Sequence, residues 1–149
     1  MQHAPQYKKA KIDKAFEPEM PVFVVDDDPA YLNMLGFYLK KNTNCKVYCY
    51  FSGEECLQNI NLNPRVIVLD YYLNENMNGI EVLKQIKKIN PETEVVMLSG
   101  QETLQVATDS LKSGAFSYVI KDRQAFYSIR KIIEDLYNGT ASYDLGRLF

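Results

Sequence analysis

Four short apolar runs constrain the fold of this chain, because each is rich in β-branched residues and each stops at a polar residue. They span residues 22–25, 66–69, 95–98 and 116–120. Continuous apolarity, without the alternation of a half-exposed strand, indicates strands covered on both faces, as in a parallel sheet. A fifth run, residues 46–51, mixes polar and apolar side chains and is predicted to be an edge strand.

Helical patterns fill the gaps between these runs. Asp28 can cap a helix that has Pro29 at its first position, and Ser52 with Glu55 three residues later matches a capping box. Asp122 can cap a last helix. Apolar residues recur at the spacing of an amphipathic helix in four places: Leu32, Leu35, Gly36 and Leu39; Ile80, Leu83 and Ile86; Leu104, Ala107 and Leu111; Phe126, Ile129, Ile133 and Leu136.

The alternation of five strands with five helices predicts one three-layer α/β domain with right-handed crossovers over residues 21–138. Residues 1–20 mix lysine with acidic residues without a clean period, so we expect a loosely ordered leader. Residues 139–149 are too few for a further domain and are expected to form a C-terminal tail.

Charge and rare residue types exclude several functions. The net charge of −2 argues against a protein built to hold nucleic acid, and no apolar run approaches the ~20 residues that span a bilayer. Cys45, Cys49 and Cys56 lack zinc-ligand spacing, so we expect thiols in a reducing cytoplasm. His3 is the only histidine and lies in the leader, which excludes most histidine-based catalysis from the folded part.

The polar residues at the ends of the apolar runs are candidates for a site. They are Asp26 and Asp27, Asp70, Ser99 and Lys121. Ligands of an open parallel sheet bind beyond the carboxyl ends of its strands, so these side chains should meet at one rim. Three close carboxylates raise one another's pKa unless a cation joins them. Magnesium suits such a site, with manganese as an alternative ion.

This set of groups is suited to phosphoryl transfer, in which positioning and charge neutralisation supply most of the catalysis. Asp70 would attack as the nucleophile and form an acyl phosphate. The metal and Lys121 would neutralise the phosphoryl oxygens, and Ser99 would donate a hydrogen bond. Movement of Ser99 toward the new group would vacate space for Tyr118, which gives a two-state switch.

The strings VVDDDP, VIVLD, VVMLSG and SYVIK, in this order, resemble the receiver domains of bacterial two-component response regulators, particularly single-domain regulators like those of chemotaxis. The resemblance covers residues 21–138 and implies a flavodoxin-like fold: a five-stranded parallel sheet in the order 2-1-3-4-5, with five helices on both faces. It also implies a role for each site residue: metal binding by Asp26, Asp27, Asp70 and the main-chain carbonyl of Tyr72, phosphorylation of Asp70, a switch formed by Ser99 and Tyr118, and phosphate binding by Lys121.

Two departures from the family pattern stand out. Asp122 follows Lys121 where the family usually has a proline, so we expect a trans peptide there. The loop from Asp70 to Gly79 is one residue longer than usual and carries a bulky Tyr72. We hypothesise that Tyr72 and Gln101 flank the path of hydrolytic water and set the lifetime of the phosphoryl group.

The resemblance implies a cytoplasmic signalling phosphoprotein that is not an enzyme beyond its own phosphorylation and slow dephosphorylation. Its donor would be a sensor histidine kinase, a histidine phosphotransfer protein or acetyl phosphate. The face formed by the fourth helix, fifth strand and fifth helix would dock a downstream protein. The broad apolar stripe of the last helix also fits a homodimer. Neither direct nucleic-acid binding nor membrane insertion is expected.

Two alternatives stay open at this point. Asp26 and Asp28 form an Asp-x-Asp pair after the first strand, as in haloacid-dehalogenase-type phosphohydrolases, where Asp26 would be the nucleophile. A degenerate receiver that binds partners without phosphorylation is the other. Taken singly, Ser99 could be a turn residue, Lys121 a surface lysine and Tyr118 a packed core aromatic.

Overall fold

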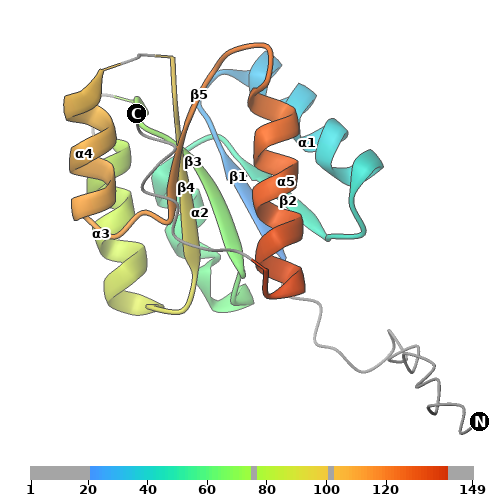
Figure 1. The fold of residues 1–149 in the computed structure, drawn as a ribbon. Helices are drawn as coiled ribbons and strands as arrows, with labels where there is room; N and C mark the ends of the chain where they lie inside the picture. The colour runs from blue at the N-terminus through green and yellow to red at the C-terminus, as the bar shows by residue number, and fades with distance from the viewer. Residues whose placement is uncertain (1–20, 75–76, 101–102, 141–149) are drawn as a thin grey trace, which may run out of the picture.

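The structure is a computed structural model that describes residues 21–74, 77–100 and 103–140 (Figure 1). Strands and helices alternate along these residues. Their bounds are β1 (Val22–Val25), α1 (Pro29–Asn42), β2 (Val47–Tyr50), α2 (Gly53–Gln58), the 3-10 helix η1 (Ile60–Leu62), β3 (Val66–Asp70), α3 (Gly79–Ile89), β4 (Glu94–Ser99), α4 (Leu104–Lys112), β5 (Ser117–Ile120) and α5 (Ala125–Asn138). The five predicted strands and five predicted helices are all confirmed, and the ends of the strands differ from the predicted ones by at most one residue.

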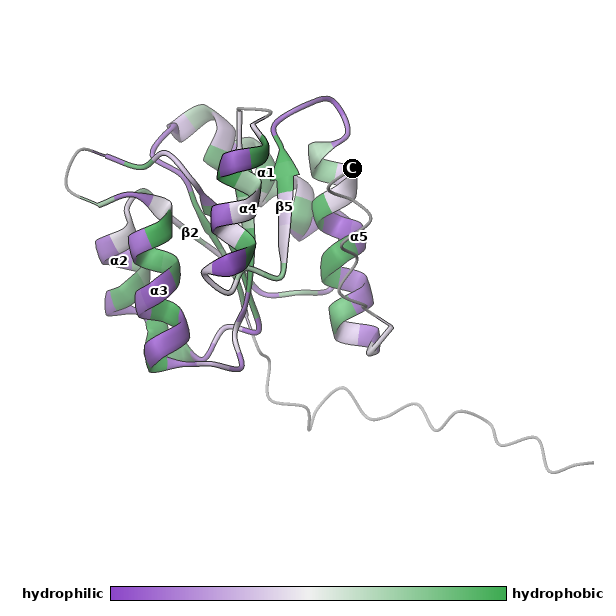
Figure 2. Ribbon diagram, turned by 60° about the vertical axis from the view of Figure 1, so that its left-hand side comes forward, coloured by the Kyte–Doolittle hydropathy of each residue, from purple (hydrophilic) through white to green (hydrophobic). Residues whose placement is uncertain are grey.

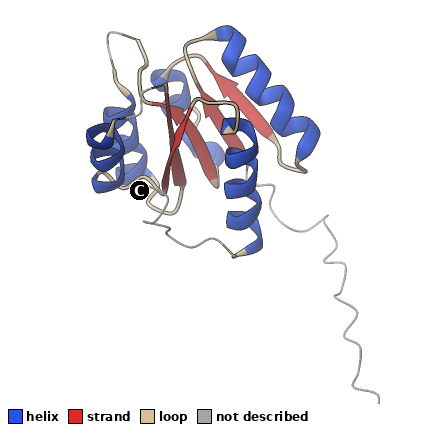
Figure 3. Cartoon of the chain, turned by 45° about the horizontal axis from the view of Figure 1, so that its top comes forward, coloured by secondary structure: helices blue, strands red, loops and turns tan. Residues whose placement is uncertain are grey.

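The five strands form one parallel sheet in the order β2-β1-β3-β4-β5, as expected. Helices α1 and α5 cover one face, while α2, α3 and α4 cover the other (Figure 3). Because the strands are parallel, all their carboxyl ends lie at one edge, the upper edge in Figure 1. The order of the strands reverses between β1 and β3, which places a topological switch point at that edge.

Two hydrophobic clusters flank the sheet, one on each face. Val22 and Val24 of β1 pack toward α1 and α5, whereas Phe23 and Val25 pack toward α2 and α3. Every residue of β1 and β3 is buried, which explains why both strands are apolar except for Asp70 at the end of β3. Apolar residues of β5 lie between α4 and α5 in Figure 2. All three cysteines are free thiols: Cys56 is buried, and Cys45 and Cys49 are half-buried.

Capping side chains begin two of the helices as the sequence predicts. Asp28 accepts hydrogen bonds from the N–H groups of Ala30 and Tyr31 at the start of α1. At the start of α2, Ser52 accepts a hydrogen bond from the N–H of Glu55. The Glu55 carboxylate accepts from Phe51 rather than from Ser52, so that capping box is incomplete.

At two other helix starts, one cap was not identified from the sequence and one predicted cap is wrong. A complete capping box between Asn78 and Glu81 begins α3, although the sequence pattern alone did not identify it. Asp122 does not cap α5, because the cap position is Gln124. The Asp122 carboxylate instead accepts from the Gln124 N–H at 2.8 Å and closes the turn before the helix.

Among the described residues, none of the helices has the length and hydrophobicity of a membrane-spanning segment.

Gly79 holds the loop after β3 against the end of the sheet, and its N–H donates to the Tyr71 carbonyl at 2.9 Å. A Cβ at this position would lie 2.8 Å from the Tyr71 Cα and 2.9 Å from the Met97 Cε, and it would also collide with the Asp70 carbonyl. We therefore expect Gly79→Ala to lower the free energy of unfolding by about 1–3 kcal/mol, measured by urea denaturation.

Gly100→Ala is the matched control, because a Cβ there meets no atom within 4 Å. Its effect should stay within about 0.5 kcal/mol. Equal stability of the Gly79→Ala variant and the wild type would show that the loop does not depend on this close approach.

Candidate functional site

Three acidic residues meet at the carboxyl edge of the sheet, beyond the ends of the adjacent strands β1 and β3. Asp70 ends β3, and Asp26 and Asp27 follow directly after β1, whose Val25 pairs with Leu69. Asp26 is 0% exposed and Asp70 is 4% exposed, whereas Asp27 is exposed. One carboxylate oxygen from each lies within 4.8 Å of the others. The predicted meeting of these three carboxylates is confirmed.

Lys121 reaches this acidic cluster from the end of β5. Its Nζ lies 2.7 Å from Asp26 Oδ2 and 3.4 Å from Asp70 Oδ2. The Lys121 N–H donates to the carbonyl of Ser99 at 2.8 Å, which fixes the backbone of the lysine to the end of β4. The Lys121–Asp122 peptide is trans, as expected, since the described residues contain no cis peptide.

Backbone groups orient the two buried carboxylates. Asp26 Oδ1 accepts from the Asp28 N–H at 2.9 Å, and Asp70 Oδ1 accepts from the Tyr72 N–H at 3.3 Å. Each carboxylate therefore has one oxygen on a backbone N–H and the other toward Lys121. This pairing leaves neither side chain free to turn without losing a charge-assisted hydrogen bond.

The charges in the site are not balanced. Burial and the neighbouring Asp26 carboxylate raise the pKa of Asp70 from 3.8 to about 7, although the Lys121 ammonium and the Tyr72 N–H act in the opposite direction. Burial by itself would lower the pKa of Lys121, but its hydrogen bond to Asp26 and the charge of Asp70 raise that pKa above 10.5. One ammonium is therefore insufficient to neutralise this acidic cluster.

The donor set fits a hard divalent cation. Carboxylate oxygens are the preferred ligands of magnesium, which binds few protein groups and keeps several waters. Asp27 is exposed, so the site is open to solvent on its side. A cation here would also favour the ionised form of Asp70, which burial opposes.

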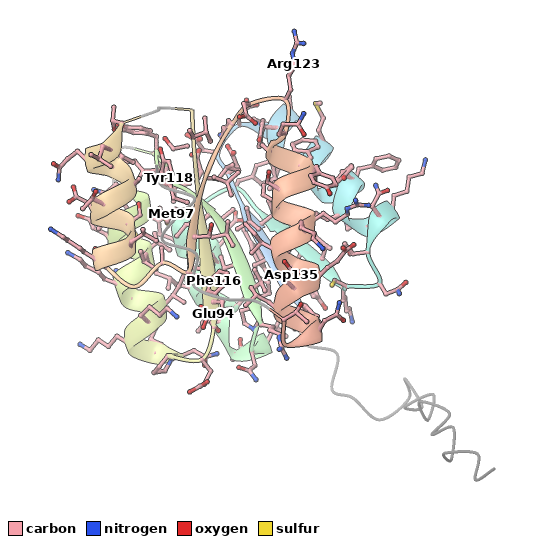
Figure 4. The ribbon with its side chains drawn as sticks, viewed as in Figure 1. Glu94, Met97, Phe116, Tyr118, Arg123 and Asp135 are labelled. Carbon is pink, nitrogen blue, oxygen red and sulfur yellow. The ribbon has the colours of Figure 1, made fainter. Side chains whose placement is uncertain are left out.

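The structure describes three of the four remaining predicted residues. Ser99 is fully buried at the end of β4, between β3 and β5. Tyr118 is half-buried on β5, where it pairs with Met97 and packs against the hydrophobic cluster on the α2, α3 and α4 face of the sheet (Figure 4). Tyr72 is 47% exposed, and its ring packs edge-on against Tyr71. Gln101 lies outside the described residues.

Tyr31 belongs to the site, although the sequence pattern did not identify it. Its ring centroid lies 4.4 Å from the Lys121 Nζ. Burial and the charges of Asp26, Asp70 and Asp122 raise the pKa of Tyr31 to about 12, so its hydroxyl stays protonated at neutral pH. Its position in the first turn of α1, shortly after the acidic triplet, is the only signal in the sequence that could have identified it.

Asp70→Asn should increase stability in a pH-dependent way when no divalent metal is present. A folded-state pKa above the ordinary value means that the folded protein binds this proton more tightly than the unfolded chain does. Proton binding by Asp70 therefore stabilises the folded state fully below about pH 4, and this stabilisation is lost as the pH rises through about 7. We expect the variant to gain on the order of 2 kcal/mol over the wild type at about pH 8, and much less at about pH 4.5.

Urea denaturation at both pH values measures this difference. Asp135→Asn is the control, because Asp135 forms a similar 3.5 Å ion pair with Lys131 at the other end of α5 (Figure 4). A gain for Asp70→Asn that is the same at both pH values would contradict the electrostatic origin of the effect.

Comparisons with known proteins agree with this geometry. Residues 22–134 match the family model described as the response regulator receiver domain. The transcriptional regulatory protein ZraR of Escherichia coli strain K12 is 29% identical over 123 residues, which cover 83% of this chain and 27% of that protein. The chain spans about a quarter of the length of the curated relatives it matches.

Solved structures show the same relationship. The receiver domain of the Francisella response regulator 1452 superposes with a TM-score of 0.72 at 30% identity, covering 81% of this chain and 98% of that one. The BeF3-activated receiver domain of DrrB, a protein of Thermotoga maritima, also gives a TM-score of 0.72, at 25% identity. The match covers 80% of this chain and 97% of that one. The sheet order, the acidic edge and these matches together show that the chain belongs to the response regulator receiver domain family of two-component systems.

Proposed function

We propose that this receiver domain accepts a phosphoryl group on Asp70 with the help of magnesium, and that the phosphorylated form signals to a docked protein. The observation that carries this proposal is the position of Asp70. It is a buried carboxylate held 3.4 Å from an ammonium and within 4.8 Å of two further carboxylates. Such a group is well placed to attack phosphorus beside groups that neutralise the transferred charge.

The proposed reaction needs only the groups at this edge and a phosphoryl donor. A carboxylate oxygen of Asp70 forms a bond to phosphorus while the bond between phosphorus and the donor breaks. The electron pair leaves with the imidazole of a phosphohistidine or with the acetate of acetyl phosphate, and Asp70 becomes an acyl phosphate. The donor protein would be a sensor histidine kinase or a histidine phosphotransfer protein.

Lys121 and Ser99 would bind the transferred group. The Lys121 Nζ, which pairs with Asp26, already lies 3.4 Å from Asp70 Oδ2, so a small movement would bring it to a phosphoryl oxygen on Asp70. Ser99 ends the neighbouring strand and carries a hydroxyl that can donate a hydrogen bond. Neither residue would need a rearrangement of the sheet.

The metal site in this proposal consists of Asp26, Asp27, Asp70 and the main-chain carbonyl of Tyr72. The clustered carboxylate oxygens and the raised pKa of Asp70 support it. Bound magnesium, or manganese in its place, would neutralise charge on the phosphoryl oxygens. Asp26 and Asp70 would at the same time keep their hydrogen bonds to backbone N–H groups.

The signal would travel from Asp70, on the central strand β3, to the outer strand β5. Phosphorylation adds about one negative charge and new acceptor oxygens, which would draw the Ser99 hydroxyl toward Asp70 and let Tyr118 move inward. Tyr118 also lines a groove of about 530 Å³ between α4 and α5, together with Leu104, Ala107 and Tyr127. We propose that a downstream protein, or a second copy in a homodimer, docks on this α4–β5–α5 face.

Two further points belong to the same proposal. The free state of all three cysteines supports a location in the reducing cytoplasm. The related DrrB receiver domain is a BeF3-activated form, which supports a response of this fold to a small bound group. We propose no enzymatic activity on other molecules and no direct contact with nucleic acid.

Incubation with acetyl phosphate and magnesium, followed by intact-mass measurement, tests the proposal. We expect the wild type to gain one phosphoryl group and Asp70→Asn to gain none, because the nucleophile is lost. Asp135→Asn should behave as the wild type does, since that carboxylate lies far from the site (Figure 4). Peptide mapping should place the added mass on the peptide that contains Asp70.

The same experiment distinguishes the two alternatives. A phosphohydrolase that uses Asp26 would keep the adduct in Asp70→Asn and lose it in Asp26→Asn. Its nucleophile would have to be a fully buried carboxylate already bonded to Lys121 and to the Asp28 N–H. A wild type that gains no mass from acetyl phosphate or from a phosphorylated histidine protein would be a degenerate receiver.

A further inference from the structure

The ammonium of Lys121 is enclosed on three sides, and only two of them are carboxylates. Asp26 Oδ2 lies 2.7 Å from the Nζ and Asp70 Oδ2 lies 3.4 Å from it. The third side is the ring of Tyr31, whose centroid is 4.4 Å from the same atom. This distance is well inside the ~6 Å within which an aromatic face attracts a cation.

The Tyr31 residue is itself held in place by two elements. Its N–H points to the Asp28 carboxylate at 3.4 Å, in the first turn of α1. Its ring contacts the ring of Phe126, in the first turn of α5, at a centroid distance of 5.5 Å and an interplanar angle of 80°. The ring therefore contacts both the lysine ammonium and the half-buried Phe126, and these contacts restrict its movement.

The ring, rather than the hydroxyl, makes this contact. The Tyr31 Oη is buried and has no hydrogen-bond partner among the residues that the structure describes. A buried hydroxyl without a partner does not anchor a side chain. The attraction between the ammonium and the ring face is the interaction that remains.

We propose that Tyr31 is a positioning residue that holds the Lys121 ammonium beside Asp70, where it can bind the phosphoryl group during transfer. The inference rests on the proposed function of Lys121 in binding the phosphoryl group. A lysine side chain has many rotamers, and each one that points away from Asp70 lowers the rate. The ring removes those rotamers and excludes water from one side of the ammonium, so α1 contributes to the reaction through Lys121.

The test compares rates of phosphorylation by acetyl phosphate at saturating magnesium. Tyr31→Leu, which keeps an apolar side chain but loses the aromatic face, should be slower than wild type by about threefold to tenfold. Tyr31→Phe, which keeps the face, should stay within about twofold of wild type. The magnesium concentration for half-maximal rate should be the same in all three proteins, because the carboxylates are unchanged.

Two controls separate positioning from a general structural effect. Tyr38→Leu removes another α1 tyrosine that contacts Phe126, at 5.4 Å, and that makes no described contact with Lys121. It should keep the wild-type rate. In a Lys121→Ala background, Tyr31→Leu should cause no further loss of rate, because the group that it positions is absent. An equal loss in both backgrounds, or equal losses for Tyr31→Phe and Tyr31→Leu, would overturn the proposal.

A second readout does not depend on phosphorylation. Protons at the end of the Lys121 side chain should show an upfield ring-current shift in NMR spectra of the wild type and of Tyr31→Phe, and lose it in Tyr31→Leu. Absence of that shift in the wild type would overturn the contact itself. If the shift is present and the wild type accepts no phosphate, the proposed function fails while the contact stands.

Discussion

The contact of one ammonium with two buried carboxylates is the interaction on which the site depends. Lys121 reaches from β5, past β4, to Asp70 and Asp26 at the ends of β3 and β1. Without it, the folded chain would bury two like charges close together, which is strongly unfavourable. With it, the acidic cluster remains short of positive charge, and the pKa of Asp70 stays raised to about 7. This remaining excess of negative charge makes the carboxyl edge of the sheet suitable for binding a divalent cation.

The sheet supplies the precision that this arrangement needs. Strands β1 and β3 are buried on both faces, so their ends cannot shift without exposing apolar side chains. The loop after Asp70 is held by the close approach of Gly79 and by the Asn78 capping box. Rigid packing on both sides explains how a cluster of like charges can persist at one edge of a small domain.

Much of this could be predicted from the sequence, because continuous apolar runs identify parallel strands and the residues that end them must share an edge. Asp26, Asp27, Asp70 and Lys121 meet for that reason. Local signals were less reliable: Asp122 resembles a helix cap, but its carboxylate closes the turn that precedes the helix. Tyr31 was not recognised, because its contact with Lys121 joins two elements that only the fold brings together.

The central claim is that Asp26, Asp27 and Asp70 form a site that a divalent cation completes. Urea denaturation at increasing magnesium concentration and constant ionic strength tests it most directly, with Asp27→Asn as the comparison because Asp27 is exposed and makes no ion pair with Lys121 among the described contacts. The account predicts that wild-type stability rises by about 1.4 kcal/mol per tenfold magnesium above the dissociation constant, and that Asp27→Asn loses most of this rise. A wild type that magnesium does not stabilise, or a variant stabilised equally, would contradict it.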